Sequence, residues 1–237
     1  MAQGLARKLS STAAALGWRD TFLFALSRAL DRLFGTRVRL IKYRFVVQPV
    51  SAPPGAQRID PNARRSGSFA LGEAGPDSPL FAQIERPREV IARRFAQGAR
   101  CLAATVDKDR LAGFLWYVLG PYDEDEVRAR FVPGPAGKVA WDFDVSILPR
   151  YRMGRLFSYL WEHASSELAA QGVGHSTSRI SAFNPASIAS HRRLGARDVG
   201  TASFLCIGRV QLMWASTAPR FHLSWRDGQR PEIRIEA

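Results

Sequence analysis

The segment from residue 139 to residue 183 restricts the possible folds of this chain more than any other. The sequence predicts strands over 139–147 and 176–183, and an amphipathic helix over 154–171 between them. The apolar face of this helix is made of Leu156, Phe157, Leu160, Trp161, Ala164 and Leu168. Two neighbouring strands joined through one helix lie parallel, and the connection is right-handed. The segment therefore predicts a βαβ crossover whose helix covers the sheet.

The flanking elements predict an α+β protein with a mixed central sheet and helices on both faces. Further helices are expected over 20–34, 88–97 and 185–194. Further strands are expected over 38–50, 101–106, 111–119, 203–207 and 210–216. Residues 51–80 hold five of the fourteen prolines, which predicts a loop. We expect a basic N-terminal extension with an amphipathic helix over 1–36 and a single domain over 37–237.

The turn between the first strand and the helix of the crossover carries an anion-binding pattern. Arg150, Arg152 and Arg155 lie within six residues, and Gly154 allows close approach of the backbone. A helix N-terminus exposes unpaired N–H groups with a partial positive charge, and arginine adds fork-shaped donors. The turn is thus a candidate cradle for a diphosphate, and the alternative is a solvated arginine-rich turn.

A short helix directly after the crossover is the second landmark. Asn184 suits the N-cap, Pro185 the first helical position and Gly195 the C-terminal stop. Such capping residues alone describe any short helix, so their place immediately after the second strand is what makes them informative.

Both landmarks resemble those of the GNAT superfamily of N-acetyltransferases. The coenzyme loop of that family reads roughly V-x-P-x-Y-R-G-x-G-x-G, and residues 147–157 read ILPRYRMGRLF. The family's next landmark reads N-x-x-A-x-x-x-Y-x-K-x-G-F, and the matching positions are Asn184, Ser187, His191, Arg193, Gly195 and Ala196. The resemblance covers about 100–216 and includes the spacing of the two landmarks.

Several positions depart from the family pattern. Met153, Arg155 and Phe157 replace its glycines, and Gly154 is displaced by one position. His191 stands where the family has a tyrosine, which usually protonates the departing coenzyme A thiolate.

The resemblance implies a GNAT-like acyltransferase domain over 37–237, using acetyl-CoA as cosubstrate and no metal. An amine of a small molecule or peptide would attack the thioester directly. The implied coenzyme-binding residues are Val145, Ile147, Arg152, Met153, Gly154, Arg155, Leu156 and Asn184. The alternative is a module of the same fold that binds acyl-CoA, or serves in interactions, without catalysis.

Three residues are candidates for proton transfer. Period-two geometry places Asp142 and Asp144 on one face of the strand 139–147, where either could accept the proton of the amine. The alternative for both is structural pairing with arginine. His191 could act as the acid, because an ordinary histidine has a pKa of about 6.5, and the alternative is a histidine on a helix surface.

The net charge of +13 is concentrated near the N-terminus. Residues 1–60 carry ten basic and three acidic side chains, which favours an anionic partner. The alternative is compositional, since 30 of the 34 basic residues are arginine, as in GC-rich bacterial coding. We expect a cytoplasmic protein that contacts no nucleic acid. The amphipathic residues 18–35 indicate peripheral contact with the inner face of the membrane as a further hypothesis.

Overall fold

The computed structural model describes residues 16–50, 69–152 and 155–237. The chain divides into two compact units. The first unit comprises the described parts of Met1–Gln48, Asp123–Val132 and Ser178–Glu236. The second comprises those of Pro49–Tyr122 and Pro133–Thr177, together with Ala237.

The second unit contains an antiparallel sheet with the strand order β7-β4-β3-β2. Its strands are β2 (Ala70–Ala74), β3 (Arg100–Val106), β4 (Arg110–Val118) and β7 (Val139–Ile147). Its helical elements are η2 (Pro79–Gln83), α3 (Arg88–Ala96), η3 (Pro149–Tyr151) and α4 (Leu156–Ala170). The expected loop over 51–80 thus contains β2 and part of η2, while 51–68 lie outside the described residues.

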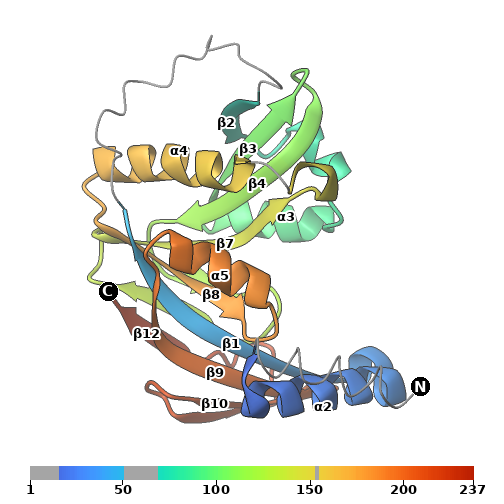
Figure 1. Ribbon diagram of the computed structural model, residues 1–237. Coiled ribbons are helices and arrows are strands. Elements are labelled where there is room, and N and C mark those ends of the chain that lie inside the picture. The colour runs from blue at the N-terminus through green and yellow to red at the C-terminus, as the bar shows by residue number, and fades with distance from the viewer. Residues whose placement is uncertain (1–15, 51–68, 153–154) are drawn as a thin grey trace. The chain divides into compact units, whose positions relative to one another are not determined.

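Helices cover both faces of this sheet. Neighbouring residues of β4 point to opposite faces, and Trp116 and Tyr117 are both fully buried. Trp116 packs edge-to-face against Phe95 of α3, whereas the Tyr117 hydroxyl donates a 3.0 Å hydrogen bond to Glu167 of α4. Helix α3 therefore lies on one face and α4 on the other, and Figure 1 shows α4 crossing the strands.

The predicted βαβ crossover is confirmed. Strand β7, helix α4 and strand β8 (His175–Ser181) follow one another, and β7 and β8 are neighbours in the sheet. The first residues of β8 belong to the second unit, where Gly174 N donates to Lys138 O and the Thr177 hydroxyl donates to Ala140 O. These contacts advance in the same direction along both segments, as in a parallel pair. The fold is α+β, with a mixed sheet that includes this pair.

The first unit contains the sheet order β11-β10-β9-β1-β8, where β8 contributes its last four residues. The other strands are β1 (Val38–Pro49), β9 (Arg197–Ile207), β10 (Val210–Ala215) and β11 (Phe221–Ser224). A short helix, α5 (Pro185–Arg193), packs on this sheet, since Ile188 joins Val46 and Ile180 in one buried cluster. A second, three-stranded sheet has the order β12-β6-β5. Its strands are β5 (Tyr122–Asp123), β6 (Arg130–Gly134) and β12 (Glu232–Glu236), and the sequence predicted none of them.

The amphipathic helix is confirmed as α2 (Trp18–Phe34), which ends at Gly35 and leads through η1 (Gly35–Arg37) into β1. Its buried residues are polar: Asp20 accepts hydrogen bonds of 2.6 Å from Lys42 and 2.8 Å from Arg44 of β1. The large apolar side chains Phe22, Leu26 and Leu33 of α2 are consequently directed away from the sheet, and Phe22 is 68% exposed.

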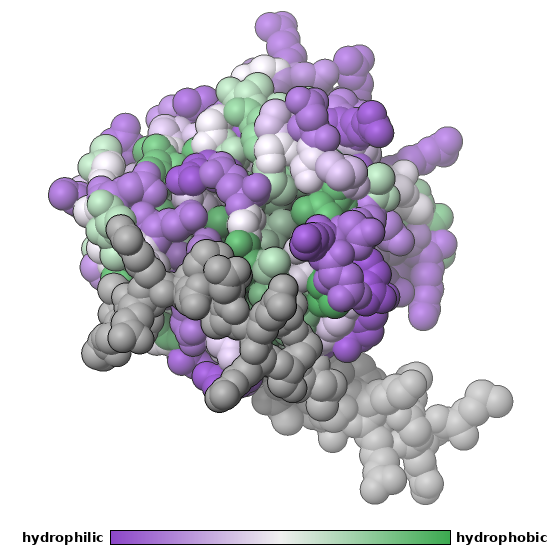
Figure 2. All heavy atoms as spheres, turned by 90° about the horizontal axis from the view of Figure 1, so that it is seen from above, coloured by the Kyte–Doolittle hydropathy of each residue, from purple (hydrophilic) through white to green (hydrophobic). Residues whose placement is uncertain are grey.

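Figure 2 shows one face of the molecule, on which hydrophilic side chains predominate and hydrophobic ones form small groups. Within the described ranges, no helix is both long and apolar enough to cross a bilayer.

Candidate functional site

The turn from β7 into α4 presents a helix N-terminus suited to an anion. Pro149 opens the single turn η3 after β7, and α4 begins at Leu156 with Arg155 as its N-cap residue. Among the described residues, no side chain caps α4, and its first turn contains no acidic residue. The start of α4 therefore directs backbone amide groups and the positive end of the helix dipole toward a site suited to an anion. Met153 and Gly154 lie outside the described residues.

Three exposed arginines surround this helix start. Arg150 lies over the ring of Tyr151 at 4.9 Å, and Arg155 lies over that of Tyr159 at 5.5 Å. Arg152 donates a 2.9 Å hydrogen bond from Nε to the carbonyl of Ile147, which ties the turn to the end of β7. In the part of the chain that the structure describes, none of the three forms an ion pair with a carboxylate. Their charges thus remain available to a bound anion, although the same geometry fits a solvated turn.

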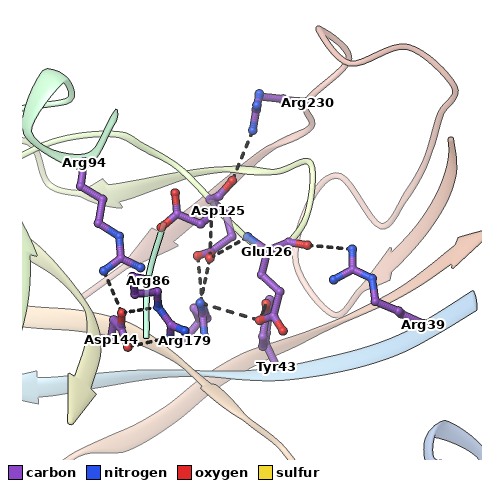
Figure 3. A network of polar contacts seen from close by, with 10 residues as sticks. Arg39, Tyr43, Arg86, Arg94, Asp125, Glu126, Asp144, Arg179 and Arg230 are labelled. Carbon is purple, nitrogen blue, oxygen red and sulfur yellow. Dashed lines mark hydrogen bonds and ion pairs between the residues drawn. The ribbon is translucent and has the colours of Figure 1, made fainter. Parts of the chain in front are cut away.

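The two aspartates of β7 occupy different environments. Asp144 accepts hydrogen bonds from Arg94 at 2.7 Å and from both Nε and Nη2 of Arg86 at 3.1 Å (Figure 3). Asp142 is buried and accepts a 2.7 Å hydrogen bond from the hydroxyl of Ser176. The expectation that both carboxylates share one face is wrong. Asp144 has a φ of +47°, and its carboxylate binds Arg94, which also packs on the ring of Phe143. Asp144 therefore lies on the face of Phe143, although neighbouring residues of a regular strand point to opposite faces. A residue in the left-handed region interrupts the alternation of a strand.

The arginines keep Asp144 ionised. Burial by itself would raise the pKa of Asp144, but the charge of Arg94 and the hydrogen bonds from Arg86 and Arg94 outweigh it and lower the pKa below its ordinary value. This environment agrees with the structural-pairing alternative for Asp144. It also makes the carboxylate a weaker proton acceptor.

His191 lies in the first unit, on α5, and is 3% exposed. Its Nδ1 is 3.0 Å from Oε1 of Gln48, which makes Nδ1 the donor in the tautomer protonated there. Burial lowers the pKa of His191 to about 4, so the imidazole is neutral near pH 7. The alternative that His191 lies on an exposed helix surface is therefore wrong.

Asn184 serves as the N-cap of α5, as its position predicted. Its Oδ1 accepts a 3.1 Å hydrogen bond from the amide of Ser187, and Pro185 follows at the first helical position. The two helix starts thus differ: the side chain of Asn184 caps α5, whereas no side chain of residues 16–50, 69–152 or 155–237 caps α4.

Sequence reasoning missed a buried ion cluster in the first unit. Four consecutive acidic residues, 123–126, favour a solvated loop, but Glu124 is 3% exposed and accepts hydrogen bonds of 2.7 and 3.0 Å from Arg179 of β8. Arg179 also lies over the ring of Tyr43, whose hydroxyl donates to Glu126 at 2.5 Å. The one available signal was an arginine in the middle of a predicted strand, which needs a buried partner.

Comparisons with known proteins give limited similarity. No protein-family model matches the chain, and no curated protein matches it. Similar solved structures include a functionally unknown conserved protein from Staphylococcus epidermidis, with 10% identity and a TM-score of 0.48 over 76% of this chain and 66% of that one. They also include a putative GNAT-family acetyltransferase from Novosphingobium aromaticivorans, with 16% identity and a TM-score of 0.47 over 71% and 66%.

A third similar structure is the aminoglycoside 6'-N-acetyltransferase of Acinetobacter baumannii, with 14% identity and a TM-score of 0.41 over 54% of this chain and 90% of that one. This chain thus spans just under two thirds of the first two structures. Because all three TM-scores are below 0.5, these similarities do not indicate a function for this chain. Its function is inferred below from its own residues.

Proposed function

We propose that this protein transfers an acetyl group from acetyl-CoA to an amine of a small molecule or peptide. The observation that carries the proposal is the start of α4, which no described side chain caps and which three exposed arginines surround, directly after the first strand of a parallel crossover. A diphosphate carries the charge and the acceptor oxygens that amides and guanidinium groups bind.

The proposed coenzyme contacts follow the course of the chain. The backbone of Val145 and Ile147, in the partly exposed second half of β7, would hold the pantetheine arm. The amides of residues 153–156 would hold the diphosphate, with Arg152 and Arg155 as charged support. Asn184 is assigned a contact to the coenzyme in addition to its capping role.

The chemistry is a direct attack of the neutral amine on the thioester carbonyl. The C–N bond forms, the C–S bond breaks, the amine loses a proton, and coenzyme A leaves as a thiolate that takes up a proton. Of the two aspartates, Asp142 is retained as the candidate base, because two guanidinium groups hold Asp144 and lower its pKa. We assign Asp144 a positioning role on β7.

A second candidate function is supported by His191. An imidazole with a pKa of about 4 is uncharged near neutrality, and in the tautomer described above its proton is directed to Gln48. Such a group donates a proton to a thiolate poorly. The alternative is therefore a protein that binds acyl-CoA without transferring the acyl group.

The test measures binding and turnover separately. Calorimetric titration of the full chain with acetyl-CoA should give a dissociation constant in the micromolar range, and Arg152→Ala with Arg155→Ala should weaken binding about tenfold or more. Arg209→Ala, which removes an arginine that is 88% exposed in the first unit, is the matched control and should bind normally. Absence of binding at millimolar acetyl-CoA would refute both candidates.

Turnover then separates the two. Release of free coenzyme A thiol in the presence of a panel of primary amines, with acetylated product seen by mass spectrometry, supports the transferase. In that case Asp142→Asn should lower kcat while the affinity for acetyl-CoA is retained. Binding without amine-dependent thiol release across the panel would support the non-catalytic alternative.

A further inference from the structure

The large apolar side chains that are exposed gather in the first unit. Of the large apolar residues exposed in the described ranges, all but Leu119 and Tyr159 belong to this unit. On α2, Trp18, Phe22 and Leu33 are 77, 68 and 74% exposed. Single exposed apolar residues are ordinary on a protein surface, but a contiguous group marks an interaction site.

Strand register shows that the sheet contributes to the same surface. Residues opposite one another in antiparallel strands share a face, and the pairs Leu40–Leu205, Leu205–Leu212 and Leu212–Leu223 form one row across β1, β9, β10 and β11. The exposed fraction rises along this row from 5% at Leu40 to 42% at Leu223.

The neighbouring row fixes where α2 lies. It contains Lys42, Ser203, Trp214 and Phe221, and Lys42 is one of the two residues of β1 that bind Asp20 of α2. Helix α2 therefore lies on this face at β1, and Figure 1 shows it beside the strands of this sheet. At β10 and β11, Trp214 and Phe221 are 38 and 63% exposed on the same face. We call this face, with the exposed side of α2, the outer apolar surface.

Arginines are interspersed with these apolar residues. The exposed arginines on α2, η1 and the turns between β9, β10 and β11 are Arg19, Arg28, Arg32, Arg37, Arg209 and Arg220. The nearby exposed acids are fewer: Asp31 pairs with Arg28, and Asp227 pairs with Arg209 and Arg128. Large aromatic side chains flanked by arginine match an anionic lipid interface, where rings enter the headgroup region and guanidinium groups bind phosphates. The same positive charge disfavours a second copy of the chain as occupant.

We propose that the outer apolar surface docks the protein onto an anionic phospholipid bilayer without crossing it. The aromatic residues of α2 and of β10–β11 enter the headgroup layer from one side of the sheet, and the arginines bind lipid phosphates. This proposal is independent of the acyl transfer proposed above.

Vesicle co-sedimentation of the full chain tests the proposal. The protein should bind vesicles of phosphatidylcholine with about one third phosphatidylserine, and binding to phosphatidylcholine alone should be at least about tenfold weaker. Phe22→Gln with Phe221→Gln should weaken binding to the anionic vesicles by about tenfold or more, because both rings leave the headgroup layer. Arg32→Glu with Arg37→Glu should weaken it by at least about fivefold per residue.

The control is Leu119→Gln, which replaces an apolar residue of the second unit that is 43% exposed, and it should bind as the parent does. Unchanged thermal unfolding midpoints would show that the variants remain folded. Equal binding to neutral and anionic vesicles, or full binding by the Phe22 and Phe221 variant, would overturn the proposal. A third outcome would also overturn it. If the parent bound no vesicles but dimerised with rising concentration, and the Phe22 and Phe221 variant did not dimerise, a second copy of the chain would be the partner of this surface.

Discussion

The guanidinium of Arg94 donates a 2.7 Å hydrogen bond to the carboxylate of Asp144, a residue of β7 with a φ of +47°. The arginine side chain is 3% exposed and also lies 5.2 Å from the ring centres of Trp116 and Phe143. The pair therefore joins α3 to the middle of the sheet at the point where β7 leaves regular strand geometry.

Asp144→Asn should destabilise the protein by about 3 kcal/mol, because it leaves a buried guanidinium without its counterion. Asparagine tolerates the left-handed region, so the loss reflects charge and not backbone strain. Urea denaturation measures the effect, with the exposed Asp109→Asn as control. A loss below about 0.5 kcal/mol, which is typical of surface substitutions, would show that the pair contributes little.

Stability should fall as the pH is lowered from about 6.5 toward 4, and His191 is the cause. Burial lowers the pKa of His191 to about 4 from 6.5, so in this window the unfolded chain binds a proton that the folded one does not. Unfolding then becomes more favourable by up to about 3 kcal/mol as the pH drops. Denaturation midpoints at a series of pH values measure the slope.

His191→Gln should remove most of that slope, since glutamine does not titrate.

The carboxylates affect stability in a second, separate pH range. The pKa of Asp20 is lowered because the hydrogen bonds and charges of Lys42 and Arg44 outweigh its burial, and that of Asp144 is lowered by Arg94 and Arg86. Their contribution is complete above the ordinary pKa of 3.8 and is lost below it. If the dependence of stability on pH between 6.5 and 4 persisted in His191→Gln, His191 would not be its cause.

Gly113→Ala should disturb the sheet where β7 leads toward the candidate site. A Cβ at Gly113 of β4 would lie 2.7 Å from Cδ1 of Ile147 and 2.9 Å from the carbonyl oxygen of Ser146. The backbone oxygen cannot move without shifting β7, so we expect a loss of about 2 kcal/mol and weaker binding of acetyl-CoA. Gly72→Ala, with no atom within 4 Å, is the control and should be neutral in both measurements.

Local sequence signals predicted the helices α2, α3, α4 and α5 and the strands of the crossover. The period of the apolar residues identified α2, α4 and the strands of the crossover, and Asn184 and Gly195 marked the ends of α5 because capping is a short-range interaction. The left-handed conformation of Asp144 could not be predicted, since its neighbours are ordinary strand residues and the conformation is held by Arg86 and Arg94. Those arginines lie 58 and 50 positions away in the chain.

The same limit applies to the first unit. The four residues 123–126 are all acidic, and such a run has no apolar period and favours a solvated loop. The burial of Glu124 depends on Arg179, 55 positions later, and the strands β6 and β12 pair across a still longer separation. Pairings of this kind are set by the packing of the whole unit and leave no pattern in a local window.

The pair of buried Glu124 and half-buried Arg179 offers the sharpest test of the first unit. Glu124→Gln keeps the shape of the side chain but removes the charge that faces Arg179, so the protein should lose about 3 kcal/mol of stability. Tyr43→Phe removes only the hydrogen bond to Glu126 and should cost about 1 kcal/mol. The double variant Glu124→Gln with Arg179→Met should lose clearly less than the sum of its two single variants, because no unpaired charge remains buried. Additive losses within about 0.5 kcal/mol, measured by urea denaturation, would mean that the two side chains are not coupled and that the ion pair does not hold residues 123–126 against β8.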